Sequence, residues 1–302
     1  MSRRQTSGRS QSVRDRLLAR ARETGRPYEE LLQYYAIERF LYRLSISTHR
    51  DHFVLKAGLM LLVWDQQLTR PTRDIDLLSH GDPSLAAAML SEVCDQATGD
   101  DGLEFAANSM RVQPITRQAA YEGIRLRFDG HLGTARIPMQ VDIAIGDPIT
   151  PAAESIDYPT LLDFPAPRLK AYPRATLAAE KAETMVRLGE VNSRMQDFFD
   201  LWLLSRRYAF DGATLCSAFS RTFAGRGSTV QPSAACLSVE FGAAARKQAQ
   251  WDSFLRRSRL DAVEDDFGRI VSEIQEFIAP VLRALAGGHT FSASWKPHGP
   301  WE

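Results

Sequence analysis

The sequence predicts an α+β fold, in which a mixed sheet with flanking helices is followed by a mainly helical C-terminal domain. Up to about residue 150, short apolar runs typical of strands alternate with segments of helical spacing. Beyond residue 173 the apolar positions recur with helical spacing. Prolines interrupt the periodicity between these two parts, at Pro148, Pro151, Pro159, Pro165, Pro167 and Pro173.

These observations predict four segments in the chain. They are a basic N-terminal arm over residues 1–26, a sheet-containing domain over residues 27–150, a proline-rich crossing segment over residues 151–173, and a helical domain over residues 174–302.

The sheet-containing domain is predicted to begin with an amphipathic helix over residues 27–46, because its apolar residues recur at helical spacing. A strand, a turn and a helix follow at 53–55, 56–58 and 59–67, and Pro71 ends this pattern. The next strand is expected at 74–78 and a second helix at 84–97. Three more strands are expected at about 111–117, 121–128 and 134–145.

The helical domain is predicted from five segments of helical spacing, at 174–188, 193–208, 212–224, about 246–260 and 264–286.

The composition is that of a globular protein, with 44% hydrophobic and 25% charged residues in 302. We expect a cytoplasmic protein that does not enter a membrane, because no run approaches 18 apolar residues and the first thirty residues lack an apolar stretch. The three cysteines are widely spaced, which argues against disulfides and structural zinc. The formal net charge of zero argues against non-specific coating of nucleic acid.

The N-terminal arm departs from this charge balance. Residues 1–26 contain eight arginines against Asp15 and Glu23. Two interpretations remain open: a basic arm that contacts phosphates, or a frayed tail that leads into a helix.

Two aspartates in the strand at 74–78 are the first candidate site. Side chains two apart in a strand project from the same face, so Asp74 and Asp76 present their carboxylates together while Ile75 and Leu77 point into the core. Carboxylate oxygens suit magnesium, and two such ions stabilise both the attacking and the leaving oxygens of an in-line displacement. The alternative is an ordinary solvated strand end.

The residues around this pair suggest a larger constellation. Gly58 begins an apolar helix, whose first N–H groups could bind phosphate, and Lys56 stands just before it. Asp142 lies in a later strand, where its carboxylate could join the first two. The alternative for Asp142 is an exposed position on a half-buried strand.

At this point the sequence resembles a known family. Residues 53–59 (FVLKAGL) followed by 70–77 (RPTRDIDL) look like the first motif of the AbiEii/AbiGii nucleotidyltransferase toxins, members of the DNA polymerase β-like superfamily. Residues 177–181 (LAAEK) resemble the family's A-E-K motif, and residues 194–201 (RMQDFFDL) its R-x-x-D-x-x-D motif. The resemblance covers roughly residues 50–205 and implies a nucleotidyltransferase-like mixed sheet.

The resemblance also implies roles for single residues. Asp74, Asp76 and Asp142 would be catalytic ligands of magnesium or manganese, and Asp142 could accept the proton of the attacking hydroxyl. Lys181 would neutralise the triphosphate, and Asp197 would orient Lys181 or the substrate.

Further residues would bind the phosphates of the nucleotide, namely Lys56, Gly58, Thr72, Arg73 and Lys181. One departure is Leu59, which stands where superfamily members often have serine or threonine. Thr72 matches a hydroxyl position that an antitoxin kinase phosphorylates in some of these toxins, although R-P-T is also an ordinary turn.

We therefore expect a magnesium-dependent toxin of a toxin–antitoxin system that transfers nucleotides from a nucleoside triphosphate to an RNA acceptor, the 3′ end of tRNA, with a cognate antitoxin as a partner. The alternatives are a non-catalytic nucleotide-binding protein and a phosphotransferase that acts on protein.

Overall fold

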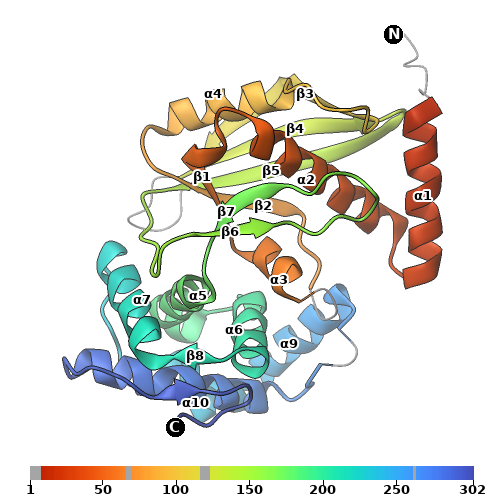
Figure 1. Cartoon of the computed structure of the whole chain (residues 1–302). Coiled ribbons are helices and arrows are strands. Elements are labelled where there is room, and N and C mark those ends of the chain that lie inside the picture. The colour runs from red at the N-terminus through yellow and green to blue at the C-terminus, as the bar shows by residue number, and fades with distance from the viewer. Residues whose placement is uncertain (1–7, 66–69, 116–122, 261–262) are drawn as a thin grey trace. The chain divides into compact units, whose positions relative to one another are not determined.

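The computed structural model describes residues 8–65, 70–115, 123–260 and 263–302, and it divides into two compact units (Figure 1). Unit 1 comprises residues 1–146 and 154–171, and unit 2 comprises residues 147–153 and 172–302. These limits fall close to the predicted boundaries at 150 and 173, but the segment between the boundaries is assigned differently. Residues 154–171 of the expected crossing segment belong to unit 1, whereas residues 147–153 belong to unit 2.

Unit 1 is built on a mixed sheet that has seven strands in the described residues, in the order β3-β4-β5-β2-β1-β7-β6 (Figure 1). The pairs β2/β5 and β1/β7 are parallel, and the other pairs are antiparallel. The strands are β1 (Phe53–Lys56), β2 (Asp74–Ser79), β3 (Leu103–Pro114), β4 (Gly123–Leu132), β5 (Ala135–Ile145), β6 (Glu154–Asp157) and β7 (Arg168–Ala171). The strands predicted at 53–55, 74–78 and 134–145 are confirmed; residues 116, 117, 121 and 122 of the other two predictions lie outside the described residues.

Unit 1 also contains helices, several of which pack on the strands of this sheet. They are α1 (Gly8–Thr24), α2 (Tyr28–Ile46), α3 (Gly58–Trp64) and α4 (Pro83–Cys94), with a 3₁₀ turn at Arg50–His52. Phe40 of α2 is fully buried, with its ring 5.5 Å from that of Phe105 in β3 and 5.3 Å from that of Phe128 in β4. Helix α4 begins where Asp82 accepts a hydrogen bond from the N–H of Ser84, a typical N-cap.

The N-terminal segment is largely a packed helix. In α1, Val13 and Leu17 are fully buried, and Arg9 donates from Nε to the carbonyl oxygen of Asp100. Residues 8–24 are therefore a packed helix and not the frayed tail that was one of the two interpretations, whereas residues 1–7 lie outside the described residues.

The expected crossing segment contains the antiparallel pair β6 and β7, which was not predicted. Each strand has four residues, too few for an alternating pattern to be recognised. The loop between them is held by α2: Glu38 accepts a hydrogen bond from the N–H of Leu161 at 2.7 Å, and Arg39 donates to the carbonyl oxygen of Pro165 at 2.7 Å.

Unit 2 is mainly helical. Its helices are α5 (Arg174–Leu188), α6 (Met195–Arg207), α7 (Gly212–Gly225), α8 (Val239–Ala243), α9 (Ala245–Ser258) and α10 (Phe267–Ala286), with 3₁₀ turns at Gly189–Val191 and Ala235–Leu237. The short strands β8 (Phe210–Asp211) and β9 (Ser294–Trp295) pair antiparallel. All five predicted helices are confirmed, whereas α8, β8 and β9 were not predicted.

Helix α10 forms the centre of this unit. Its apolar face includes Phe267 and Phe277, both fully buried. The ring of Phe277 lies 5.0 Å from that of Phe210 and 4.9 Å from that of Trp295, so the C-terminal residues pack on the same core.

Candidate active site

The turn between β1 and α3 brings the segment before β2 close to the first residue of the helix. A Cβ atom at Gly58 would lie 3.2 Å from Oγ1 of Thr72 and 3.1 Å from Nη2 of Arg70, so glycine permits this approach. Ala57 has a φ of 58°, an uncommon conformation for a residue with a Cβ atom. Because α3 has only seven residues, its dipole is small, and packing rather than the dipole defines this corner.

Leu59 does not stand in this corner. Its side chain is 1% exposed and belongs to the core of unit 1. At this position, where superfamily members often have serine or threonine, the chain therefore has an apolar core residue. The hydroxyl that lies close to Gly58 is that of Thr72.

Thr72 and Arg73 lead into β2. The N–H of Thr72 donates to the hydroxyl oxygen of Tyr34 at 3.3 Å, and the carbonyl oxygen of Arg73 accepts from Nε2 of Gln33 at 3.4 Å. Helix α2 thus fixes the backbone just before Asp74, while the side chain of Arg73 is exposed.

A row of charged side chains crosses four neighbouring strands. Lys56 of β1 is directly opposite Asp76 of β2, Asp76 is opposite Asp142 of β5, and Asp142 is opposite Arg125 of β4. Residues that are directly opposite project from the same face of a sheet. Lys56, Asp76, Asp142 and Arg125, which we call the charged row, therefore share one face.

Asp74 lies two residues along β2 from the charged row and on the same face. It is opposite Gln140, which is in turn opposite Arg127. Arg127 donates from Nε to Oε1 of Gln140 at 3.1 Å. The structure thus places the three aspartates that the sequence predicts for the site on one face of two neighbouring strands.

Arg125 holds the third of these aspartates. It donates from Nε to Oδ1 of Asp142 at 2.7 Å and from Nη2 to Oδ2 at 2.6 Å. Asp142 is 7% exposed, so this is a largely buried bidentate ion pair. Its partner was not anticipated from the sequence, although Arg125 and Arg127 alternate with buried Leu126 in β4.

The electrostatics favour a cation at the aspartates. Burial raises the pKa of Asp74, and the charge of Asp142 raises it further, against the opposing effects of Arg125, Arg127 and Arg73. The half-exposed carboxylates of Asp74 and Asp76 are oxygen ligands of the kind that hard divalent cations prefer. Within the described chain, however, no three carboxylate, cysteine or histidine side chains already converge as a metal site. For Asp142 to bind a cation, its ion pair with Arg125 would have to loosen.

In unit 2, the residues of the second and third motifs meet in a buried ion cluster. Nζ of Lys181, in α5, lies 2.6 Å from Oδ1 of Asp197 and 2.8 Å from Oδ2 of Asp200, both in α6. Arg194 donates from Nε to the other oxygen of Asp197 at 2.6 Å. Burial alone would raise the pKa of Asp197, but the charges of Lys181 and Arg194 outweigh it and hold this pKa below its ordinary value.

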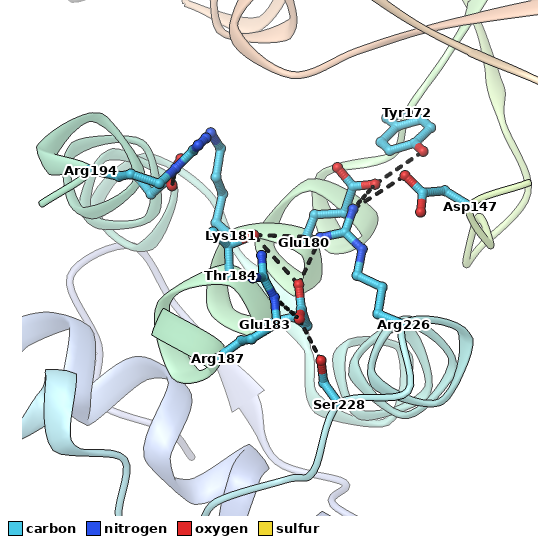
Figure 2. A network of polar contacts seen from close by, with 11 residues as sticks. Asp147, Tyr172, Glu180, Lys181, Glu183, Thr184, Arg187, Arg194, Arg226 and Ser228 are labelled. Atoms are coloured by element: carbon cyan, nitrogen blue, oxygen red, sulfur yellow. Dashed lines mark hydrogen bonds and ion pairs between the residues drawn. The ribbon is translucent and has the colours of Figure 1, made fainter. Parts of the chain in front are cut away.

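A second buried cluster lies beside the first (Figure 2). Arg226 is within 2.9 Å of Glu180, 2.8 Å of Glu183 and 3.2 Å of Asp147. Burial by itself would lower the pKa of Arg226, but the charges of these carboxylates raise it above its ordinary value. Arg226, at the end of α7, therefore ties Asp147 to Glu183 and to Glu180, the middle residue of the A-E-K motif, in α5.

The fold and the charged residues define a class of protein. A strand, a glycine turn and a helix are followed by two aspartates on one strand and a third on its parallel neighbour, and a helical unit follows with a lysine and an aspartate in contact. This is a nucleotidyltransferase-like protein.

The family is shown by comparison with known proteins. The family profile described as nucleotidyl transferase AbiEii toxin, type IV toxin–antitoxin system, matches residues 39–273. The chain belongs to this family, as its motifs predicted.

Two solved structures match this chain over most of their length. The Helicobacter pylori protein JHP933 is 13% identical, with a TM-score of 0.47, and the match covers 83% of this chain and 92% of that one. A structure from H. pylori that is provisionally named a nucleotidyltransferase is 14% identical, with a TM-score of 0.43, and the match covers 82% and 93% of the two chains. A comparison with curated proteins found no match. In the part of the chain that the structure describes, no helix is both long and apolar enough to span a membrane.

Proposed function

We propose that this protein is a toxin that transfers a nucleotide from a nucleoside triphosphate to the 3′ end of an RNA, with tRNA as the acceptor and Mg²⁺ or Mn²⁺ as the cofactor. The observation that carries the proposal is the charged row with Asp74 beside it. Three aspartates and two basic residues on one face suit a reaction in which charge develops on phosphate oxygens. Membership of the AbiEii family supports the same chemistry and implies an antitoxin as a partner.

The carboxylates of Asp74 and Asp76 would hold the divalent cation, with Asp142 as a third ligand. A bound cation would neutralise phosphate charge and polarise the reacting oxygens. Asp142 is also the residue that would accept the proton of the attacking hydroxyl, and Arg125 keeps its carboxylate oriented until the substrate binds.

The phosphates of the nucleotide would lie at the corner formed by Gly58 and Thr72. The hydroxyl of Thr72 and the basic side chains of Lys56 and Arg73 are suited to bind phosphate oxygens. In unit 2, Lys181 would neutralise phosphate charge, and Asp197 would position Lys181, which it contacts at 2.6 Å.

The position of the transferred label tests the reaction. Purified protein is incubated with total RNA, a divalent cation and each nucleoside triphosphate, labelled at either the α- or the γ-phosphate. We expect α-label on RNA with at least one nucleotide, and removal of this activity in Asp76→Asn. A γ-label on protein would instead indicate a phosphotransferase.

A matched control is available on the same sheet face. Asp129 in β4 pairs with Arg136 at 3.0 Å and lies four residues, or about 13 Å, along the strand from Arg125. Asp129→Asn should keep activity. Absence of label with every nucleotide, together with thermal stabilisation by nucleotide that Asp76→Asn abolishes, would favour a protein that only binds nucleotides.

Thr72 offers a test of the phosphate corner and of control by phosphorylation. A negative charge on this side chain would repel the phosphates that it is proposed to bind, so Thr72→Glu should lose at least about tenfold in kcat/KM. Thr72→Ser keeps the hydroxyl and serves as the control. Equal activity of the two variants would contradict the assignment of Thr72.

A further inference from the structure

A basic pocket of about 620 Å³ lies in unit 2, between the start of α6 and one face of α9. Three of its lining residues are Arg194, Arg246 and Arg257, and none is aspartate or glutamate. The chain as a whole has no net charge, so this concentration of like charge is a local feature. Arg194 pairs with Asp197, but Arg246 and Arg257 have no ion pair with an acidic side chain among the described residues, and like charges gathered in this way favour the binding of an anion.

The arginines retain hydrogen-bonding capacity for a ligand. Arg194 uses Nε to contact Asp197, and Arg257 uses Nε to contact the carbonyl oxygen of Ser253. Neither pairs through its Nη atoms with any described residue, and the guanidinium of Arg246 has no hydrogen bond or ion pair within the described ranges. The planar edge with two Nη atoms is the part of arginine that binds phosphate oxygens.

The spacing along α9 suits an extended anion better than a single phosphate. Arg246, Gln250, Ser253 and Arg257 are spaced by four, three and four residues, so they follow one stripe of the helix. Eleven residues of helix span about 16 Å. A nucleic-acid strand carries one charge per about 3.4 Å of its axis, so this stripe extends past several phosphates.

The uncharged groups between the two arginines favour RNA over an acidic protein surface. Gln250 and Ser253 place amide and hydroxyl groups between the two cations, where the sugar and base of a nucleotide need hydrogen-bonding partners. Arg194 on the opposite wall shares Asp197 with Lys181, so the pocket adjoins the residue proposed to neutralise the triphosphate.

We infer that this pocket, which we call the α6/α9 pocket, binds the phosphate backbone of the RNA acceptor. The inference rests on the proposed function, because it assigns that function's acceptor to a surface of unit 2.

The test is the affinity of the full chain for a fluorescein-labelled single-stranded RNA, measured by anisotropy without nucleotide or divalent cation. The pocket variant carries Arg246→Gln and Arg257→Gln. Its control carries Arg221→Gln and Arg256→Gln, which remove two exposed arginines of α7 and α9 that do not line the pocket. Both variants change the net charge equally, and circular dichroism checks that both are folded.

Each phosphate contact to a single strand contributes a slope of about 0.7 in log affinity against log salt. The pocket variant should therefore lose a slope of about 1.4 and bind RNA about 25-fold more weakly at about 0.1 M salt, whereas the control should lose less than about threefold. Equal affinities of the two variants would overturn the inference. So would retention of RNA binding with loss of binding to ATP or to polyglutamate, which would assign the pocket to a free nucleotide or to an acidic protein.

The RNA-affinity test of the pocket and the label-transfer test of the proposed function can fail independently. If no nucleotide is ever transferred but the pocket variant loses RNA affinity, the pocket assignment stands and the reaction is wrong. If RNA is labelled equally by the pocket variant and its control, the reaction stands and the pocket assignment is wrong.

Discussion

Replacement of Lys181 by methionine should destabilise unit 2 strongly, because it leaves two buried carboxylates without their shared cation. Asp197 and Asp200 are 1% and 0% exposed, and Lys181 lies within 2.8 Å of both. Removing one partner of a buried ion pair costs about 3–5 kcal/mol. At about 2–4 °C per kcal/mol, the melting temperature should fall by roughly 10 °C.

The measurement is urea and thermal unfolding, with a surface lysine as the matched control. Lys170 pairs with Asp51 at 3.0 Å, but the two side chains are 49% and 61% exposed. Exposed pairs are worth about 0–1 kcal/mol, so Lys170→Met should have little effect. The double variant Lys181→Met with Asp200→Asn should recover part of the loss, because one buried charge is removed.

The pH dependence gives a second readout of the same cluster. The pKa of Asp197 is lowered in the folded protein, so its contribution to stability is present above the ordinary aspartate pKa of about 3.9 and is lost as the pH falls through the folded value. The difference between wild type and Lys181→Met should therefore be full at neutral pH and shrink below about pH 4. The reasoning is refuted if Lys181→Met destabilises the protein no more than Lys170→Met does. It is also refuted if the difference in unfolding free energy between wild type and Lys181→Met grows in acid.

Two further predictions concern unit 1. Arg125→Gln should increase the thermal stabilisation produced by Mn²⁺ or Mg²⁺, because Arg125 engages both carboxylate oxygens of Asp142 in the wild type. An unchanged shift in melting temperature on adding the cation would show that Arg125 does not compete with it. Burial raises the pKa of Glu38 to about 7, so the contribution of Glu38 to the unfolding free energy should fall by about 3 kcal/mol as the pH rises from about 4.5 to 7. Glu38→Gln should flatten this dependence in urea unfolding, whereas Glu29→Gln, on the exposed side of α2, should not; parallel curves for wild type and Glu38→Gln would contradict the assignment.

The periodic elements of the fold were predictable because their patterns are local. Helices α2, α5 and α10 repeat apolar residues over many turns, and the predictions place their ends within three residues of the observed ones. The strands β6 and β7 have four residues each and few apolar side chains, so only pairing within the sheet makes them strands. Their absence from the prediction explains why residues 154–171 were expected to form part of a separate crossing segment.

The site was predictable in part for the same reason. The two-residue period of a strand places Asp74 and Asp76 on one face whatever surrounds them. Their relation to Asp142 depends on the parallel register of β2 and β5, and the ion pair of Asp142 depends on the antiparallel register of β4 and β5. Registers between strands far apart in sequence follow from the packing of the whole sheet.

By itself, the sequence determined the family motifs, the major helices, the central strands and the shared face of Asp74 and Asp76, because each depends on residues close together in the chain. Only the tertiary structure decided that Arg125 holds Asp142, that Lys181 is buried between two aspartates, and that Arg194, just before α6, lines one pocket with two arginines of α9. Charges interact over a few ångströms in space, and the packing of the core determines which distant residues come within that range.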